Sequence, residues 1–408
     1  MTRPAVQTPL FTAATAPLTG RDEFELLCEL AGADLTPERR EFIAHRKTPL
    51  DSKEFLHLAE HHGVLPLVAH NLIDDGRDVS AQNKAVWPSS EFDRSLRSAY
   101  EANLRRSLSF TAELTRIIEH FERSKLRAIP YKGPVLAQSA YGDVGLRSFF
   151  DLDFLIAPAD FDRAKRALAE IRYRPSADLS PALERLWLRI GYERMFDGPA
   201  GKNFVELQWA LLPQFYAIDF GVEGLLKRAG RAVIAAREVP CLSAEDSLLV
   251  VSLHAAKHLW ARLIWLADIA ASLRCPRLDC AAALKRAREL GILRILGVSF
   301  WLVKNVLRAT LPQPAEELIS TDARLAILGR EFAARLARGA AYDFESTEYF
   351  RLIWKLRERP TDRWKYLWRL ASTPSAGDIA VMRLPEALFP LYRIVRFARL
   401  PRFAALRR

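Results

Sequence analysis

Two aspartates, Asp151 and Asp153, stand two positions apart at the start of a run of strand-forming residues that ends at Ile156. Side chains alternate across a strand, so both carboxylates are expected on one face at a short, fixed separation. Two like charges that close are unfavourable unless a cation lies between them or one carboxyl takes a proton. Mg2+ suits such a position, because it prefers oxygen ligands and is often held by one or two carboxylates plus substrate phosphates. The alternative is a pair of solvated acids on an edge strand.

The residues that precede this pair favour the metal site. A short strand over 127–130 is followed by Lys132 and Gly133, which break it, and Pro134 fits the first turn of a helix that stops at Gly142. Lys132 supplies positive charge for a phosphate, and Gly133 permits close approach of the backbone.

Arg147 lies between this helix and the strand of the two aspartates, which we expect over 149–156. Its guanidinium could contact phosphate, as arginine often does. It could equally pair with Asp143 or Asp151 as a structural residue.

A third acid occurs on a later strand. Strand-like runs over 190–196 and 203–212 are joined by a loop over 197–202, which predicts a hairpin. In the second run Glu206 and Gln208 share a face and interrupt an otherwise apolar strand. Glu206 therefore needs a partner, and a second metal ion or a proton from an acceptor hydroxyl would provide one.

The order of strand, Lys-Gly turn, helix, Asp-x-Asp strand, helix and later acidic strand resembles the catalytic core of the DNA polymerase β-like nucleotidyltransferase superfamily. More closely, the chain is similar to the bacterial uncharacterised nucleotidyltransferase family from roughly residue 50 to the C-terminus. The segments that carry this similarity are Lys132-Gly-Pro-Val-Leu-Ala137, Tyr141-Gly-Asp143, Arg147, Asp151-Leu-Asp-Phe-Leu155, Val205-Glu-Leu-Gln-Trp209, His254-Ala-Ala-Lys-His-Leu-Trp260 and the Arg- and Leu-rich ending.

The resemblance implies transfer of a nucleotidyl group from an NTP to an acceptor, with Mg2+ as cofactor and Mn2+ as the alternative. It implies Asp151, Asp153 and Glu206 as catalytic and metal-binding residues. The residues expected to contact the nucleotide are Lys132, Gly133, Arg147, His254, Lys257 and His258. The chain departs from the superfamily by carrying Lys-Gly-Pro where Gly-Ser is usual at the phosphate turn, and Gln208 stands where similar members often have His.

His254 and His258 lie four positions apart on an expected helix that begins near Ser243 and continues through Asp268. Ala255 stands where a His-Glu-x-x-His zinc site needs Glu, so a zinc protease is disfavoured. Two interpretations remain for His254, Lys257 and His258. They line a cleft next to nucleotide or acceptor, or the histidines are hydrogen-bonded packing residues.

Composition sets wider limits. The chain has 408 residues, half of them hydrophobic, with four scattered cysteines and a net charge of +11. Residues 351–408 carry fourteen Lys and Arg against four acids, which is nearly all of the net charge. This basic tail could pack on the protein's own acidic faces, bind an anionic membrane surface, or bind RNA. The N-terminus lacks an apolar signal core, and no window approaches the length of a membrane-spanning helix.

We therefore predict an α+β fold, in which a mixed-sheet nucleotidyltransferase core is flanked by N- and C-terminal helical regions. The expected parts are a mobile arm (1–20), an N-terminal helical region (21–125), the core (126–242) and a C-terminal helical domain with the basic tail (243–408). The acceptor is left open among protein, RNA and small molecule, and the location is expected to be cytoplasmic, with peripheral membrane contact as an option. The alternatives are a core that binds nucleotide or a partner without turnover, and an RNA- or membrane-associated adaptor that acts through the tail.

Overall fold

The structure is a computed structural model, which describes residues 21–32, 39, 41, 43, 48–74, 90–199, 204–340, 343–344, 346–382 and 384–405. The side chains of Arg21 and of 400–405 are not among those described. The arm predicted over 1–20 lies outside the described residues.

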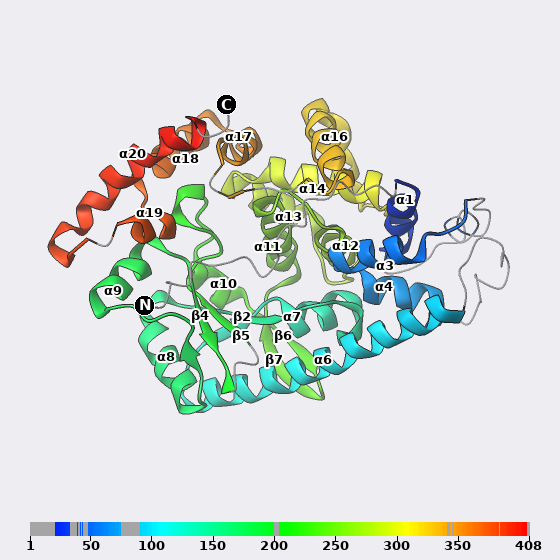
Figure 1. Ribbon diagram of the computed structural model, residues 1–408, viewed down its shortest axis with the longest axis horizontal. Coiled ribbons are helices and arrows are strands. Elements are labelled where there is room, and N and C mark those ends of the chain that lie inside the picture. Colours follow the sequence, from blue (N-terminus) through cyan, green and yellow to red (C-terminus); the bar gives the residue numbers. More distant parts are fainter. Residues whose placement is uncertain are drawn as a thin grey trace.

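A five-stranded mixed sheet lies at the centre of the fold, in the order β1-β2-β5-β4-β3 (Figure 1). Only β2 and β5 run parallel, and the other neighbours are antiparallel. The strands are β1 (Ala128–Pro130), β2 (Asp151–Ile156), β3 (Arg174–Pro175), β4 (Glu193–Asp197) and β5 (Phe204–Gln208). The α+β prediction is confirmed.

The register of the central strands brings the acids together. In the parallel β2–β5 pair Asp153 lies opposite Glu206, and in the antiparallel β4–β5 pair Glu193 lies opposite Gln208. Because successive side chains point to opposite faces, Asp151, Asp153 and Glu206 occupy the same face of the sheet.

The other face of the sheet is apolar and is covered by the 34-residue α6 (Ser90–Arg123), α8 (Phe161–Glu170) and the hairpin β6 (Gly230–Ile234)–β7 (Arg237–Cys241). Phe154 packs edge-on against Phe121 of α6, with ring centroids 5.5 Å apart, and Trp209 meets Phe161 at 5.2 Å. Apolar residues recur at helical spacing between Leu104 and Phe121 and predict one long helix over 91–124, which the structure confirms as α6.

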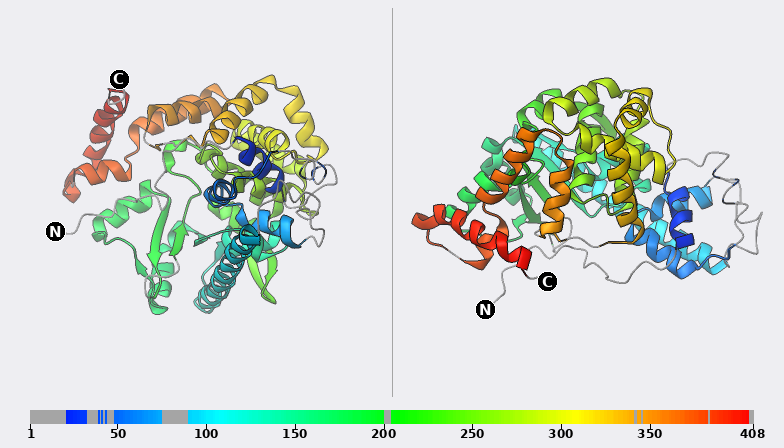
Figure 2. Two further views of the ribbon diagram at one scale, coloured as in Figure 1. Left: turned by 45° about the vertical axis from the view of Figure 1, so that its right-hand side comes forward. Right: turned by 90° about the horizontal axis from the view of Figure 1, so that it is seen from above.

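Helices from both ends of the chain form a second core above the acidic face (Figures 1 and 2). The N-terminal ones are α1 (Arg21–Leu30), α3 (Ser52–His61), α4 (Leu65–Ala69) and η1 (His70–Asp74). After the sheet come η6 (Gln214–Tyr216), α10 (Val222–Arg228), α11 (Ala244–Lys257), α12 (Leu263–Leu273), α13 (Cys280–Leu290), α14 (Leu293–Val306), α15 (Gln313–Thr321) and α16 (Ala323–Ala337). The predicted domain boundaries remain a prediction, since the two cores share the sheet.

The segment between β1 and β2 follows the sequence prediction. Pro134 lies in the first turn of α7 (Gly133–Leu136), which continues as η2 (Ala137–Tyr141) and ends at Gly142 with a left-handed φ of 80°. The short η3 (Val144–Leu146) then leads into β2.

One long helix was expected from Ser243 through Asp268, and this prediction is wrong. The chain leaves the helix after Lys257 and restarts at α12, with left-handed φ values of 52° at Leu259 and 50° at Trp260. The Trp260 indole is fully buried, donates to Ser299 Oγ at 3.0 Å and packs on Phe332. Tertiary burial of this indole outweighs the local preference for a continuous helix.

Two further boundaries also differ from the sequence prediction. The strand expected over 190–196 begins only at Glu193, because Ser180 caps a helix, α9 (Pro181–Ile190), that the sequence had not suggested. The sequence pattern over about 279–310 predicts a helical run, and the structure divides it at Gly291, whose left-handed φ of 66° ends α13.

The basic tail is folded along one side of the molecule (Figure 1). It contains α17 (Thr347–Leu356), α18 (Pro360–Ser372), α19 (Ala376–Val381), η7 (Glu386–Leu391) and α20 (Tyr392–Ala405). Two of its arginines are buried on the tail's own acids. Arg357 lies 3.8 Å from Asp362, and Arg396 lies 3.8 Å from Asp378. Across the described ranges, no helix combines the length and apolar character needed to cross a membrane.

Candidate functional site

Three carboxylates meet on the face of the sheet that looks toward α11. One oxygen from each of Asp151, Asp153 and Glu206 can be chosen so that all lie within 4.8 Å of one another. The parallel β2–β5 register causes this, since it sets Asp153 directly beside Glu206. The sequence placed these three residues in one site, and the structure brings them together.

Asp153 is the innermost acid of the cluster. Its Oδ1 accepts hydrogen bonds from Lys132 Nζ and from Gln208 Nε2, both at 3.0 Å. Its Oδ2 is buried and has no hydrogen-bond partner among the described residues. A buried carboxylate oxygen without a partner carries a free-energy penalty that a cation would remove.

Gln208 ties the acids together. Its Nε2 lies 2.8 Å from Glu206 Oε2, 3.0 Å from Asp153 Oδ1 and 3.3 Å from Glu193 Oε2. An amide nitrogen has only two hydrogens, so it cannot satisfy three carboxylate oxygens at once. The hydroxyl of Tyr131 donates to Gln208 Oε1 at 2.5 Å, which fixes the amide orientation. The amide by itself therefore leaves at least one of the three carboxylates without a full hydrogen bond from it.

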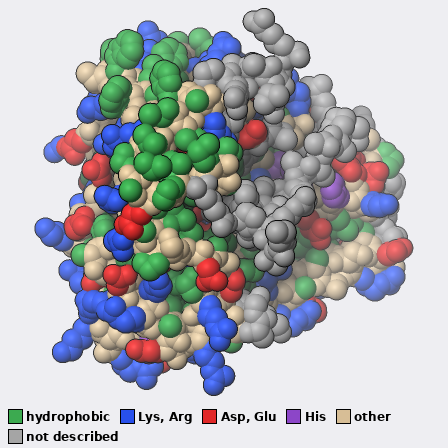
Figure 3. All heavy atoms as spheres, turned by 60° about the vertical axis from the view of Figure 1, so that its left-hand side comes forward, with side chains coloured by type: hydrophobic (Ala, Val, Ile, Leu, Met, Phe, Trp, Pro, Cys, Tyr) green, Lys and Arg blue, Asp and Glu red, His purple; other side chains and the backbone are tan. Residues whose placement is uncertain are grey.

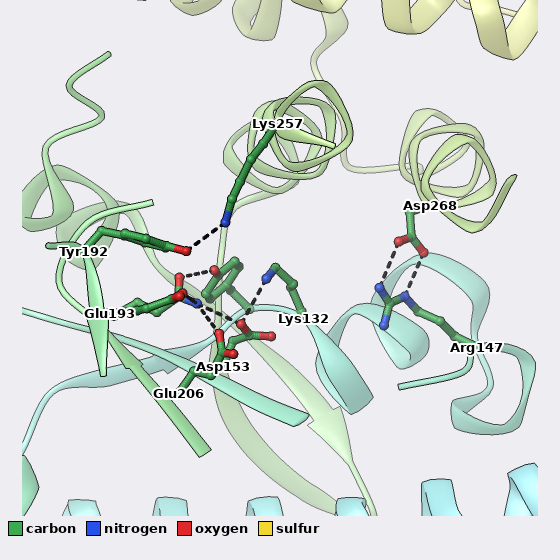
Figure 4. Close-up of polar contacts among 10 residues, drawn as sticks. Lys132, Arg147, Asp153, Tyr192, Glu193, Glu206, Lys257 and Asp268 are labelled. Atoms are coloured by element: carbon green, nitrogen blue, oxygen red, sulfur yellow. Dashed lines mark hydrogen bonds and ion pairs between the residues drawn. The ribbon is translucent and has the colours of Figure 1, made fainter. Parts of the chain in front are cut away.

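Glu193 is a fourth acid that the sequence interpretation missed. It is buried on β4, opposite Gln208, with its side chain turned toward the cluster (Figure 4). A weaker signal was available, because Glu193 lies in a strand-like run, although Arg194 beside it makes the run less apolar than the one around Glu206. What the sequence could not supply was the pairing that puts Glu193 beside the site.

Burial and the short distances between the carboxylates raise the pKa values of two of them. Burial, followed by the charge of Asp153, raises the pKa of Asp151 from 3.8 to about 6. Burial, followed by the charges of Glu193 and Asp153, raises the pKa of Glu206 well above its usual value. Without a cation, the cluster therefore retains protons at pH values where isolated carboxyls have lost them.

Two lysines face the acids from different elements (Figure 4). Burial opposes the charge of Lys132, yet Asp153 and its neighbours raise its pKa well above the usual value, so this ammonium stays charged. Lys257, at the end of α11, donates to the Tyr192 hydroxyl at 3.0 Å and lies over the Tyr192 ring. Burial lowers the pKa of Lys257.

Gly133 has a left-handed φ of 53°, and a Cβ built there would lie 3.3 Å from the Asp151 carbonyl oxygen. The turn after β1 is therefore pressed against the first residue of β2. This close packing places Lys132 beside Asp153, and it gives glycine a structural reason to be here that is independent of any ligand.

Arg147 is directed away from the acidic cluster. Its Nε and Nη2 donate to the two oxygens of Asp268 at 2.8 and 3.0 Å, and the Tyr141 hydroxyl donates to Asp268 Oδ1 at 2.8 Å. Figure 4 shows this pair to one side of Lys132, with Asp268 on α12. The structural partner is thus Asp268, and neither Asp143 nor Asp151, the two partners considered from sequence, takes that position.

His254 and His258 form an aromatic group with Trp265. The two imidazoles have centroids 4.6 Å apart, and His258 stacks on Trp265 at 4.7 Å and 28°. Burial, followed by the charges of nearby lysines, lowers the pKa of both histidines well below the usual value. Both rings are therefore neutral at pH 7, and Lys132 lies close enough to influence each of them.

The donor set fits a hard divalent cation. All three clustered ligands are carboxylates, which suit Mg2+ or Mn2+, and the described residues around them add no thiolate that would select a softer metal. The mixed sheet, the acidic cluster and the Lys-Gly turn together are those expected of a nucleotidyltransferase core.

Comparison with known proteins identifies the family of this chain. Residues 48–308 match the family described as uncharacterised nucleotidyltransferase, and this range is more than half of the chain. The chain therefore belongs to that family. A search of the curated proteins and a search of the solved structures each found no match.

The substitution Asp151→Asn tests whether repulsion among the carboxylates destabilises the metal-free protein. Folding favours the protonated form of Asp151, because its pKa is raised to about 6. That stabilisation is complete below pH ~4 and is lost as the pH rises through about 6. We expect the substitution to increase the unfolding free energy of the metal-free protein, measured by urea denaturation, by on the order of 1–3 kcal/mol at pH 8. At pH 5, which lies between the unfolded and folded pKa values, the increase should be roughly half as large.

Mg2+ should raise the melting temperature of the wild type at pH 8 and have little effect at pH 5, because the ion must displace protons from the acids. The matched control is Glu101→Gln, which removes an exposed acid of α6. Equal stabilisation by Mg2+ in the wild type and in Asp151→Asn would contradict the assignment of this residue.

Arg147→Ala and Asp268→Asn, measured singly and together, separate scaffolding from nucleotide contact. Each single change leaves a buried charge or polar group without its partner, so we expect a loss of about 3–5 kcal/mol in urea unfolding. The double variant should lose less than the sum. The two single variants should weaken NTP binding to a similar degree if Arg147 has only a structural role. A far greater loss of NTP binding in Arg147→Ala than in an equally stable Asp268→Asn would show that the Arg147 guanidinium contacts the nucleotide.

Proposed function

We propose that the protein is a metal-dependent nucleotidyltransferase that moves an NMP group from an NTP to an acceptor, with Mg2+ as the metal. The observation that carries this proposal is the partnerless buried Oδ2 of Asp153 within a cluster of three carboxylates on a sheet. The family assignment supports transfer of a nucleotidyl group, and the carboxylate cluster supports the metal.

Asp151 and Asp153 would hold the metal, and Glu206 would either ligand a second metal ion or act as the base. Bound there, Mg2+ would neutralise charge on the triphosphate oxygens, the main requirement in this type of reaction. In the overall reaction an acceptor oxygen bonds to the α-phosphorus, the bond to pyrophosphate breaks, and the acceptor loses a proton. Glu206, whose pKa is raised by burial and by its acidic neighbours, is the candidate to accept that proton.

Lys132 replaces the hydroxyl that the wider superfamily usually offers at the phosphate turn. Its ammonium is already within 3.0 Å of Asp153, so it can contact both a ligand carboxylate and a phosphate that shares the same metal. Lys257 lies across the site on Tyr192 and offers a second cation to the leaving pyrophosphate.

His254 and His258 are proposed to border the nucleotide. Their neutral rings and Trp265 present an aromatic surface next to Lys257, which suits a nucleobase or a ribose. The packing interpretation considered from sequence stays open, since the same rings contact each other.

Asp153→Asn is the sharpest test of the activity. Asparagine has nearly the same size as aspartate and can still accept a hydrogen bond from Lys132, but it removes the negative charge at position 153. Transfer of label from α-phosphate-labelled NTP should therefore fall by at least about 100-fold. The assay uses Mg2+, each NTP and a fractionated extract as acceptor source, followed by gel and thin-layer detection. Glu101→Gln should retain the wild-type rate.

Transfer that survives in Asp153→Asn would overturn the site. Tight binding of Mg-NTP by the wild type without transfer to any fraction would favour the second candidate function, a core that binds nucleotide without turnover. The observation that favours this candidate is the Lys-Gly-Pro turn, which lacks the usual hydroxyl.

Gly133→Ala and Gly142→Ala form a matched pair for the turn. Both glycines have left-handed φ, so either substitution should cost about 1 kcal/mol of stability. Only a Cβ at Gly133 meets a neighbour, the Asp151 carbonyl, whereas one at Gly142 has nothing within 4 Å. We expect Gly133→Ala to lower transfer at least about tenfold more than Gly142→Ala, measured at equal fraction folded. Equal effects would show that the turn does not position the acids.

A further inference from the structure

The tail carries an unusual concentration of exposed apolar side chains. Of the fourteen large hydrophobic residues that are exposed in the described part of the chain, nine lie between positions 364 and 397. They are Trp364, Leu367, Trp368, Val381, Met382, Leu388, Leu391, Ile394 and Phe397. We call this set the tail apolar surface.

On α18 the exposed residues form a stripe of their own. Trp364 and Trp368 are each 73% exposed and lie four positions apart, with Leu367 beside them. The opposite side of the helix, with Tyr366 and Leu370, is buried in the fold. The helix therefore has one apolar side that the core uses and a second that the described fold leaves uncovered.

The same division occurs on the last helix. Tyr392 and Arg396 of α20 are buried, whereas Ile394 is 64% and Phe397 68% exposed. Leu391 extends this stripe by one turn toward η7. Because α18, α19 and η7 all pack against α20, the exposed stripes belong to one connected part of the molecule. Figure 3, which turns this side forward, shows hydrophobic side chains gathered in a band, with Lys and Arg and also some Asp and Glu around it.

The four acids of the tail already have partners within the fold. The acids Asp362 and Asp378 are buried on arginines of the tail, Glu386 pairs with Arg185, and Glu358 accepts from the Arg294 backbone.

Lys365 and Arg369 are exposed on α18, next to the tryptophan stripe, and Arg393 is exposed on α20. The tail thus combines a net positive charge with acids that are already paired, and this favours an anionic partner.

We propose that the tail apolar surface binds an anionic membrane surface as a peripheral, interfacial anchor. Tryptophan, leucine and isoleucine on one side of a helix with Lys and Arg beside them is the composition of helices that lie in the headgroup region. Attraction of the basic side chains to acidic lipids adds to the burial of the apolar ones.

Two other occupants fit the surface less well. Single-stranded RNA is held by aromatic rings that stack on bases, but six of the nine residues are aliphatic and have no ring to offer. A second copy of the chain would bring one basic tail against another, which costs electrostatic free energy. Moreover, the whole surface lies beyond residue 308, where the match to the nucleotidyltransferase family ends, so it adds a property to the shared core.

The test is co-sedimentation of the full-length protein with extruded vesicles. One set is pure phosphatidylcholine and the other contains about 30 mol% phosphatidylglycerol. We expect binding to the anionic set, at least tenfold tighter than to the neutral set, and weaker binding as salt rises from about 0.1 M to about 0.5 M.

Two pairs of substitutions remove different parts of the surface. Trp364→Ser with Trp368→Ser, and Ile394→Ser with Phe397→Ser, should each weaken vesicle binding by at least about tenfold. Lys365→Gln with Arg393→Gln should do the same for anionic vesicles only, by roughly tenfold. The matched control is Val233→Ser with Ile327→Ser, which removes two equally exposed apolar side chains from β6 and α16 and should change nothing.

Circular dichroism and the melting temperature verify that the variants fold, and label transfer in solution should be unaffected by all of them. Vesicle binding that is unchanged in both apolar pairs overturns the proposal. So does binding to single-stranded RNA, or a concentration-dependent dimer by light scattering, that is lost in the tryptophan pair while vesicle binding persists.

Discussion

Electrostatic repulsion among closely spaced carboxylates, two of them buried and two half-buried, is the constraint on which the rest of the structure depends. Asp151, Asp153, Glu206 and Glu193 project from adjacent strands into one small volume, and a single amide, Gln208, cannot serve them all. Two features reduce this repulsion. Lys132 forms an ion pair with Asp153, and the raised pKa values of Asp151 and Glu206 favour their uncharged forms. A divalent cation bound among these carboxylates would relieve the repulsion.

The surrounding architecture holds the strained cluster in place. On the far face of the sheet, α6 and α8 supply an apolar support that fixes the strand register. On the near face α11 and α12 close over the acids, and the Arg147–Asp268 pair ties α12 to the loop before β2. A buried, bidentate pair of this kind is costly to break, which suits a contact that positions one half of a site against the other.

The two regions to which we assign a function have different physical bases. The sheet site is polar, buried and crowded with charge, and it lies within the range that matches the nucleotidyltransferase family. The tail surface is apolar, exposed and bordered by cations, and it lies outside that range. A transferase core combined with an interfacial anchor would carry out its reaction close to a lipid surface.

The sequence by itself determined which acids share a face, because the alternation of side chains along β2 and β5 is a local property. It likewise determined the Lys-Gly turn, the helix that Pro134 starts and the long stripe of α6. Only the tertiary structure decided the neighbours. The parallel register set Asp153 beside Glu206, strand pairing added Glu193, and burial of Trp260 broke a helix that looked continuous. Arg147 pairs with Asp268, which is 121 positions away in the sequence. Such contacts depend on how distant segments pack, and no short stretch of sequence contains that information.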